Sequence, residues 1–166
     1  MIRKEQFLAF YRDIVVSSEV LFALVPHDKL DWRPVETVFT LGQLMAHMVA
    51  STRVYADGVV EGSWGFTRMR AVLVANRRTV PMETGSALEQ LRENATYFAG
   101  RLSQLSDEDF EQGEVFAPQF NGPAPRWRIA LLAAEHQLNH KAELFMSLKM
   151  LGLTVHTGHL YHLEQS

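Results

Sequence analysis

The chain contains no cysteine, and this absence removes several kinds of chemistry at once. Disulfides, thiolate zinc sites, iron–sulfur clusters and a cysteine nucleophile all require the thiol that this sequence lacks. Any metal ion that the protein binds must therefore be held by imidazole nitrogen or by oxygen.

Long hydrophobic runs and excess positive charge are also lacking. No apolar stretch approaches the length of a membrane span, and the N-terminus begins charged without an apolar signal core behind it. The formal net charge of −3 offers no basic surface for nucleic acid. We therefore expect a cytoplasmic protein that has neither a membrane nor a nucleic acid as its partner.

The 166 residues are enough for one domain with a hydrophobic core and too few for two. No internal repeat, low-complexity tract or linker divides them. We expect a single helical domain over residues 1–153 and a C-terminal tail over 154–166. The tail is expected to be loosely ordered, because it contains Gly158 and ends the chain.

Apolar residues spaced three and four apart predict four helices, of which the first two have clear ends. The first carries its stripe from Phe7 onwards and is closed by Pro26. The second begins with Thr40 as N-cap, and Gln43 completes a capping box. Gly62 is expected to end this second helix.

The third and fourth helices complete the pattern. A capping box from Ser86 to Glu89 is expected to open the third helix. The fourth follows the segment 122–125 and ends at Gly152, a plausible glycine for the position after a C-cap. Alternation of the kind found in strands is absent, so the sequence predicts an all-α four-helix bundle.

A pair of histidines on the fourth helix gives the strongest functional signal. His136 and His140 are four residues apart, so both imidazoles leave the same helix face and can reach one metal ion. Their face is apolar, which predicts that they point into the bundle core. His47 on the second helix is a candidate third ligand, and three nitrogens with a fourth position left open are typical of a catalytic metal site.

These histidines also have readings that involve no metal. His47 lies at the edge of its apolar stripe, where a histidine can be hydrogen-bonded to water or to a backbone carbonyl. Two imidazoles in the middle of a buried stripe are costly without partners, and their proximity disfavours protonation of both. The pair therefore favours a metal more strongly than His47 does by itself.

The fourth helix is apolar on two opposite sides. The second apolar side includes Trp127, Leu131 and Leu138, while Gln137 is assigned to a polar flank. A helix of this kind is covered either by other helices of its own chain or by a partner subunit. We expect a homodimer.

The remaining histidines are not expected to bind the functional metal. His27 follows the first helix and is expected to neutralise its terminal carbonyls. Three more histidines lie in the C-terminal tail, where binding of metal would be adventitious. They are His156, His159 and His162.

The stretch 63–84 is ambiguous and is expected to include a short helix over 68–73. Its arginines are interpreted as a solvated surface. Alternatively, they receive an anionic substrate if this stretch folds over the metal pocket. They are Arg68, Arg70, Arg77 and Arg78.

Four segments of the chain, in their order and spacing, resemble a known family. They are Asp31-Trp32-Arg33-Pro34, Thr40-Leu41-Gly42-Gln43-Leu44-Met45-Ala46-His47, Leu105-Ser106-Asp107-Glu108-Asp109-Phe110 and His136-Gln137-Leu138-Asn139-His140-Lys141-Ala142-Glu143-Leu144. The chain resembles the DinB/YfiT-like superfamily of bacterial four-helix metalloproteins in these segments. The resemblance implies a bundle with long crossover connections, frequent homodimers, and a divalent metal bound by residues that match His47, His136 and His140.

The resemblance also bears on activity. Characterised relatives include S-transferases and isomerases that use bacillithiol, mycothiol or glutathione. We therefore expect transfer of a small-molecule thiol to an electrophile through a thiolate bound to the metal, which is expected to be zinc or nickel. The alternatives are a metal-dependent hydrolase that uses bound water and a non-catalytic bundle.

Glu143 is a candidate for a residue that contacts a metal ligand without binding the metal itself. It projects near the face of His136 and His140, one turn further along the helix, where a carboxylate can orient a ligating imidazole. Its alternative reading is an ordinary glutamate on the flank of the helix.

Overall fold

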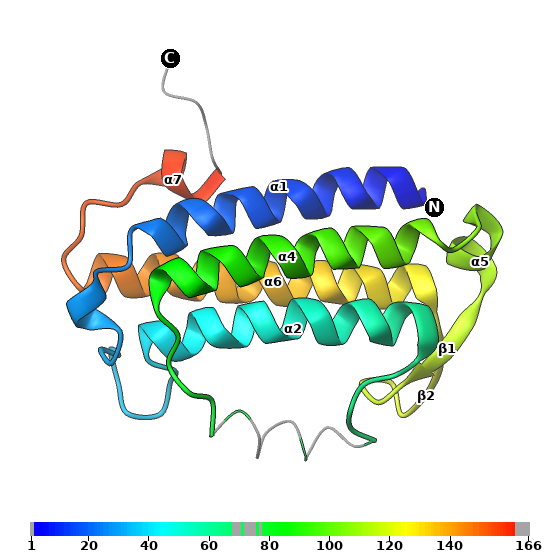
Figure 1. Cartoon of the computed structure of the whole chain (residues 1–166), viewed down its shortest axis with the longest axis horizontal. Coiled ribbons are helices and arrows are strands. Elements are labelled where there is room, and N and C mark those ends of the chain that lie inside the picture. Colours follow the sequence, from blue (N-terminus) through cyan, green and yellow to red (C-terminus); the bar gives the residue numbers. More distant parts are fainter. Residues whose placement is uncertain (1, 68–70, 72–75, 77, 162–166) are drawn as a thin grey trace.

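The computed structural model describes residues 2–67, 71, 76 and 78–161. Four long helices form a bundle (Figure 1), which confirms the all-α fold. They are α1 (Lys4–Ala23), α2 (Leu41–Glu61), α4 (Thr84–Ser103) and α6 (Arg126–Met150). The shorter elements are η1 (His27–Lys29), α5 (Asp107–Gln112), β1 (Glu114–Ala117), β2 (Gly122–Pro125) and α7 (Thr157–Tyr161).

The four long helices pack as a ring in which α1 and α2 each contact α4 and α6. The helices α2 and α4 run in the same direction, and α1 and α6 run in the opposite one (Figure 1). Because α2 and α4 are parallel neighbours, the chain must travel back along the bundle between them. The long crossover that the family resemblance implied is therefore present.

The second helix begins and ends as its sequence predicts. The Thr40 hydroxyl oxygen accepts from the Gln43 N–H at 3.2 Å, and the Gln43 side-chain oxygen accepts from the Thr40 N–H at 3.0 Å. Gly62 ends the helix in the left-handed region with φ 68°. The expected capping box is therefore confirmed. Thr40, Gln43 and Gly62 all set the ends of the helix through backbone close to them in the sequence.

The expected capping box at Ser86 is wrong, because α4 begins earlier, after Glu83 as N-cap. The Thr84 hydroxyl donates to the carbonyl of Val25 at 3.3 Å. Upstream, the Met82 N–H bonds to the backbone of α2. These tertiary contacts place the first turn of α4 before the residues that carry the local capping signal.

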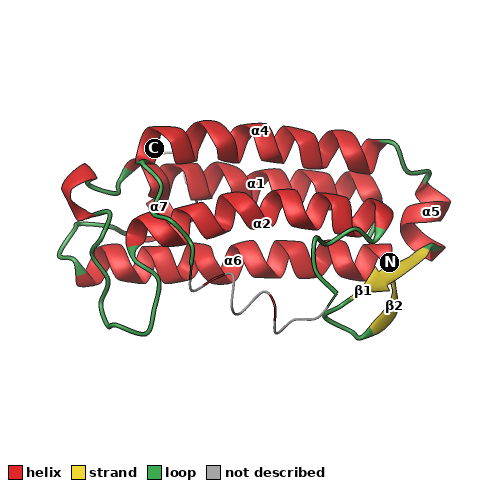
Figure 2. Cartoon of the chain, turned by 60° about the horizontal axis from the view of Figure 1, so that its bottom comes forward, coloured by secondary structure: helices red, strands yellow, loops and turns green. Residues whose placement is uncertain are grey.

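Two short strands were not predicted from the sequence. β1 and β2 pair antiparallel between α5 and α6, with Val115 opposite Ala124. β2 contains Pro123 and Pro125, which cannot donate to a ladder and conceal the strand in the sequence. Strand structure was therefore wrongly excluded, and this hairpin leads the chain into α6 (Figure 2).

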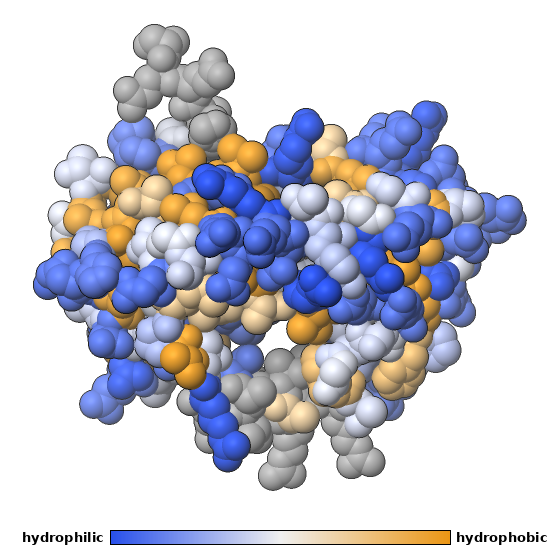
Figure 3. Space-filling view, in the orientation of Figure 1, coloured by the Kyte–Doolittle hydropathy of each residue, from blue (hydrophilic) through white to orange (hydrophobic). Residues whose placement is uncertain are grey.

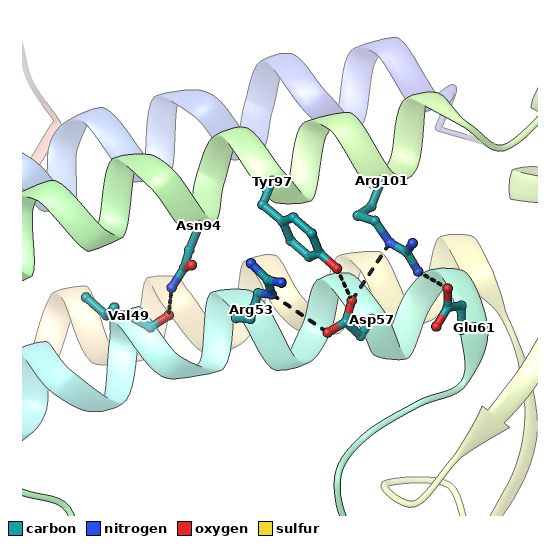
Figure 4. A network of polar contacts seen from close by, with 7 residues as sticks. All are labelled: Val49, Arg53, Asp57, Glu61, Asn94, Tyr97 and Arg101. Carbon is teal, nitrogen blue, oxygen red and sulfur yellow. Dashed lines mark hydrogen bonds and ion pairs between the residues drawn. The ribbon is translucent and has the colours of Figure 1, made fainter.

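A polar network fixes the parallel pair of α2 and α4 (Figure 4). The Tyr97 hydroxyl on α4 donates to Asp57 on α2 at 2.6 Å. The Arg53 guanidinium lies 3.3 Å from the centre of the Tyr97 ring. Arg101 pairs with Asp57 and with Glu61. Side chains from successive turns of both helices thus hold their relative register.

The buried face of α6 differs from the predicted face, because Gln137 is only 2% exposed. Its side-chain amide donates to the Met48 carbonyl at 2.8 Å and to the hydroxyls of Ser51 and Thr52. The assignment of Gln137 to a polar flank is therefore wrong. With Gln137 in the core, His136 and His140 are half-buried and lie at the edge of the buried face of α6, not in its middle.

The C-terminal tail is ordered as far as the structure describes it. The helix α7 packs on α1, contrary to the expectation of a loose segment. The Lys141 ammonium holds it in place, donating to the Leu160 carbonyl at 3.0 Å and to the Ser17 hydroxyl at 2.9 Å. Burial lowers the pKa of Lys141. Most of the expected helix over 68–73 lies outside the described residues.

The outer surface is mixed in character. Hydrophilic residues cover much of the face in Figure 3, with hydrophobic groups between them. On α6, the second apolar side is only partly covered within the chain, since Trp127, Leu131 and Leu138 are half-buried. Over the described ranges, no helix has both the length and the apolar composition that crossing a membrane requires.

Candidate metal centre

The structure brings His47, His136 and His140 together. The ring nitrogens that can bind a metal lie within 4.8 Å of one another. The ring centres of His47 and His140 are 4.6 Å apart, as are those of His136 and His140. Residues separated by about ninety positions in the sequence therefore form one cluster between α2 and α6.

The cluster depends on the register between these two helices. α2 and α6 are neighbours and run in opposite directions (Figure 1). Gln137, next to His136, donates to the carbonyl of Met48, next to His47. This buried hydrogen bond between the helices sets His136 and His47 at the same level of the bundle.

Burial keeps two of these imidazoles neutral. Loss of water, with a smaller contribution from the nearby His140, lowers the pKa of His47 to about 4. Loss of water also lowers the pKa of His136 to about 3, with smaller contributions from His140 and His47. Neutral imidazoles keep the lone pairs that a metal ion requires.

One nitrogen of the cluster has no partner of its own. The Nε2 atom of His136 is buried and makes no hydrogen bond with the described residues. A buried polar atom without a partner is costly, so its presence calls for a missing group. A divalent ion shared with His47 and His140 satisfies this atom, and the three residues therefore fit a metal.

Glu143 contacts the cluster through the ring of His140. Its Oε2 atom lies 2.9 Å from the Nδ1 atom of His140, one turn away on α6. A carboxylate at this position favours the proton on Nδ1 and leaves Nε2 of His140 free to face the other histidines. The geometry is the one expected of a residue that orients a metal ligand.

The sequence did not identify the aromatic groups around the cluster. Phe39 stacks on the His47 ring with 5.0 Å between ring centres. Tyr55 lies with its ring centre 5.4 Å from that of His136, and Trp64 packs edge-on against Tyr55. Of these contacts, only the close approach of Trp64 to Gly58 had a signal in the sequence, because a glycine inside a helix often marks such an approach.

Two cavities lie near the cluster, one lined by His47 and His136 and the other by Phe39 and Glu143, which contact His47 and His140. The first, which we call the aromatic cavity, has a volume of about 440 Å³ and includes His47, Tyr55, Trp64, Phe66, Gln119 and His136 in its lining. The second, the polar cavity, has a volume of about 630 Å³ and includes Arg33, Glu36, Phe39, Gln43 and Glu143. Both have the size of sites for small molecules.

The other candidates from the sequence lie elsewhere. His27 is exposed and lies 2.9 Å from a carboxylate oxygen of Glu83, so its expected role at the carbonyls of α1 is not observed. The rings of His156 and His159 each accept a backbone N–H at the start of α7. Of the four arginines, the described part of the chain includes only Arg78, which is exposed.

Comparisons with known proteins agree with this fold. A sequence model of the DinB superfamily matches residues 17–144. The chain is 24% identical over 131 residues to the uncharacterised protein YjoA of Bacillus subtilis (strain 168), a match that covers 78% of this chain and 79% of YjoA.

Two solved structures are similar in fold. A DinB-like protein from Bacillus cereus ATCC 10987 has a TM-score of 0.72 at 21% identity, with 92% of this chain and 95% of that chain covered. The structure of the DinB-like protein YjoA has a TM-score of 0.68 at 19% identity, with 90% of this chain and 93% of that chain covered. At these identities the likeness concerns the fold alone.

Proposed function

The chain belongs to the DinB superfamily, and we propose that it is a metal-dependent enzyme that transfers a low-molecular-weight thiol to an electrophilic substrate. The observation that carries this proposal is the convergence of three imidazoles, with the buried Nε2 of His136 left without a partner. His47, His136 and His140 are the proposed ligands, and zinc or nickel is the proposed ion.

Three neutral protein ligands determine the chemistry that such a site supplies. A divalent ion held by three imidazoles keeps its full charge and lowers the pKa of a thiol or water molecule that binds beside it. The chain has no cysteine, so no thiol of the protein competes for that position.

The residues around the cluster support this chemistry in distinct ways. Glu143 holds the His140 ring in one orientation through their 2.9 Å contact. Phe39 covers one face of His47 and excludes water from it. The Tyr55 ring packs beside His136, with 5.4 Å between ring centres, and burial raises the pKa of Tyr55 to about 12.

The proposed reaction is balanced without an oxidant or reductant. The thiol sulfur forms a bond to an electrophilic carbon of the second substrate. In a substitution, the leaving group departs from that carbon and the thiol proton is released with it or to solvent. In an addition to a double bond, the proton is added to the neighbouring carbon.

The test uses protein that is purified without an affinity tag and loaded with zinc or nickel. Glutathione, bacillithiol and mycothiol are each offered with a panel of electrophiles, and loss of free thiol is followed. We expect metal-dependent turnover with at least one thiol, and its loss in the double variant His136→Ala, His140→Ala. His27→Ala, an exposed histidine on η1, is the matched control and should retain activity.

Two outcomes would contradict the proposal. Metal-dependent hydrolysis of an ester or amide, without turnover of any thiol, would identify the protein as a hydrolase. Stoichiometric metal binding without either activity would identify a non-catalytic bundle.

A further inference from the structure

The two cavities lie on opposite sides of the histidine cluster, along the groove between α2 and α6. On α2, Gln43 precedes His47 by one turn and lines the polar cavity, whereas Tyr55 follows His47 by two turns and lines the aromatic cavity. On α6, which runs the opposite way, Glu143 lines the polar cavity and His136 the aromatic one. His47 and His136 line the aromatic cavity, whereas the polar cavity reaches the cluster through Phe39 and Glu143, and Asn76 lines both cavities.

The aromatic cavity has rigid, apolar walls. Trp64 is 4% exposed, packs against Gly58, and donates from its indole nitrogen to the Phe116 carbonyl at 2.8 Å. Phe66 continues this wall, with its ring centre 6.2 Å from that of Trp64. The two rings are tilted by 54° to each other and form an apolar corner against which another ring can pack.

Besides the Nε2 atom of His136, one further polar atom in this cavity lacks a partner. The side-chain oxygen of Gln119 is buried and accepts no hydrogen bond from the residues that the structure describes. A ligand that places an N–H or O–H beside it would satisfy this oxygen. The aromatic cavity thus suits an aromatic molecule that carries a hydrogen-bond donor.

The polar cavity has a different chemistry. Arg33 and Glu36 both line it, both are exposed, and neither forms an ion pair within residues 2–67, 71, 76 and 78–161. An arginine binds a carboxylate through paired N–H groups, and a glutamate binds an ammonium group. This combination suits a molecule that carries both charges, as an amino-acid group does.

We propose that the polar cavity binds the charged part of the thiol and that the aromatic cavity binds the electrophile. This assignment rests on the proposed function, since it divides two substrates between two cavities. The thiol, anchored by Arg33 and Glu36, extends its sulfur past Phe39 towards the histidines. The electrophile packs on Trp64 and Phe66 and presents its carbon from the other side, so the C–S bond forms at the histidine cluster.

Two binding measurements test the assignment without turnover. Zinc-loaded full-length protein is titrated with 2,4-dinitroaniline, an unreactive aromatic amine that quenches tryptophan fluorescence, and separately with glutathione by calorimetry. Phe66→Ala should raise the Kd of the amine about 3- to 10-fold through lost apolar contact and leave that of glutathione within about twofold. Arg33→Ala should raise the Kd of glutathione about 2- to 5-fold and leave that of the amine unchanged.

Matched controls and a check of folding accompany these variants. Val80→Ala and Arg12→Ala remove an exposed valine and an exposed arginine that line neither cavity, and neither should change either Kd. Circular dichroism and zinc affinity should be the same in all four variants. A variant with altered circular dichroism is replaced by Phe66→Leu or Arg33→Gln.

The outcomes separate this assignment from the proposed function. Selective binding of the two probes without any thiol transfer would support the assignment and overturn the proposed function. Turnover in which both variants weaken both probes equally would overturn the assignment and leave the function standing. Absence of binding by either probe would also overturn the assignment.

Discussion

Removing the carboxylate of Glu143 should weaken metal binding although Glu143 is not a proposed ligand. Its Oε2 lies 2.9 Å from Nδ1 of His140, so the substitution Glu143→Ala frees the ring to rotate and removes a neighbouring negative charge. Removing a group that orients a metal ligand typically lowers metal affinity about 10- to 100-fold, which is roughly 1.4–2.8 kcal/mol. Glu143→Gln keeps an acceptor in place and should cost less than Glu143→Ala.

The assay is a zinc titration of metal-free protein in competition with a chromophoric chelator. Glu135→Gln removes an exposed glutamate from the same helix and should leave the Kd within about twofold. The double variant His136→Ala, His140→Ala defines the affinity of protein without the site. If Glu143→Ala binds zinc as tightly as the parent protein, the contact with His140 does not orient a ligand and the reasoning is refuted.

Four further outcomes are expected. Gly58→Ala places a Cβ atom 2.6 Å from the Trp64 indole and should lower the free energy of unfolding by about 1–3 kcal/mol in urea. Gln137→Ala should cost about 1–3 kcal/mol in the same measurement, because it leaves a buried carbonyl with fewer donors. Metal-free protein should lose stability in thermal melts as the pH falls from 6.5 to about 3. Over that range the unfolded chain binds protons at His47 and His136 that the folded chain excludes, whereas above it these two groups should not affect stability. Light scattering at micromolar concentration should show a homodimer, and a monomer would contradict the expectation drawn from the half-covered side of α6.

The sequence predicted best those features that depend on neighbouring residues. Thr40, Gln43 and Gly62 act on backbone within one or two turns, and the bounds of α2 follow from them. The start of α4 was wrong because Thr84 bonds to the carbonyl of Val25, which is distant in the sequence. Local capping signals cannot report such a contact.

The residues of the candidate site also divide into those that local spacing predicts and those that only the tertiary fold brings together. The four-residue spacing of His136 and His140 placed two imidazoles on one face, and the three-residue spacing to Glu143 placed the carboxylate beside them. Phe39 and Trp64 reach the cluster through the tertiary fold, so their spacing from the histidines carries no such information. The chemistry of the ligands was therefore predictable, whereas the shape of the space around them was not.

The sequence pattern placed His136 and His140 in the core because it misjudged one residue, Gln137. The same residue explains how the site is built. Hydrophobic periodicity treats Gln137 as a surface residue, but the Met48 carbonyl and two hydroxyls on α2 accept its amide hydrogens and allow it to be buried. With Gln137 on the buried face of α6, His136 and His140 lie at the edge of that face, at the rim of the groove. At the rim, His47 and His136 lose enough water to remain neutral, yet both line the aromatic cavity, through which a small molecule can reach them. A histidine cluster in the centre of the bundle would have met the first requirement and failed the second.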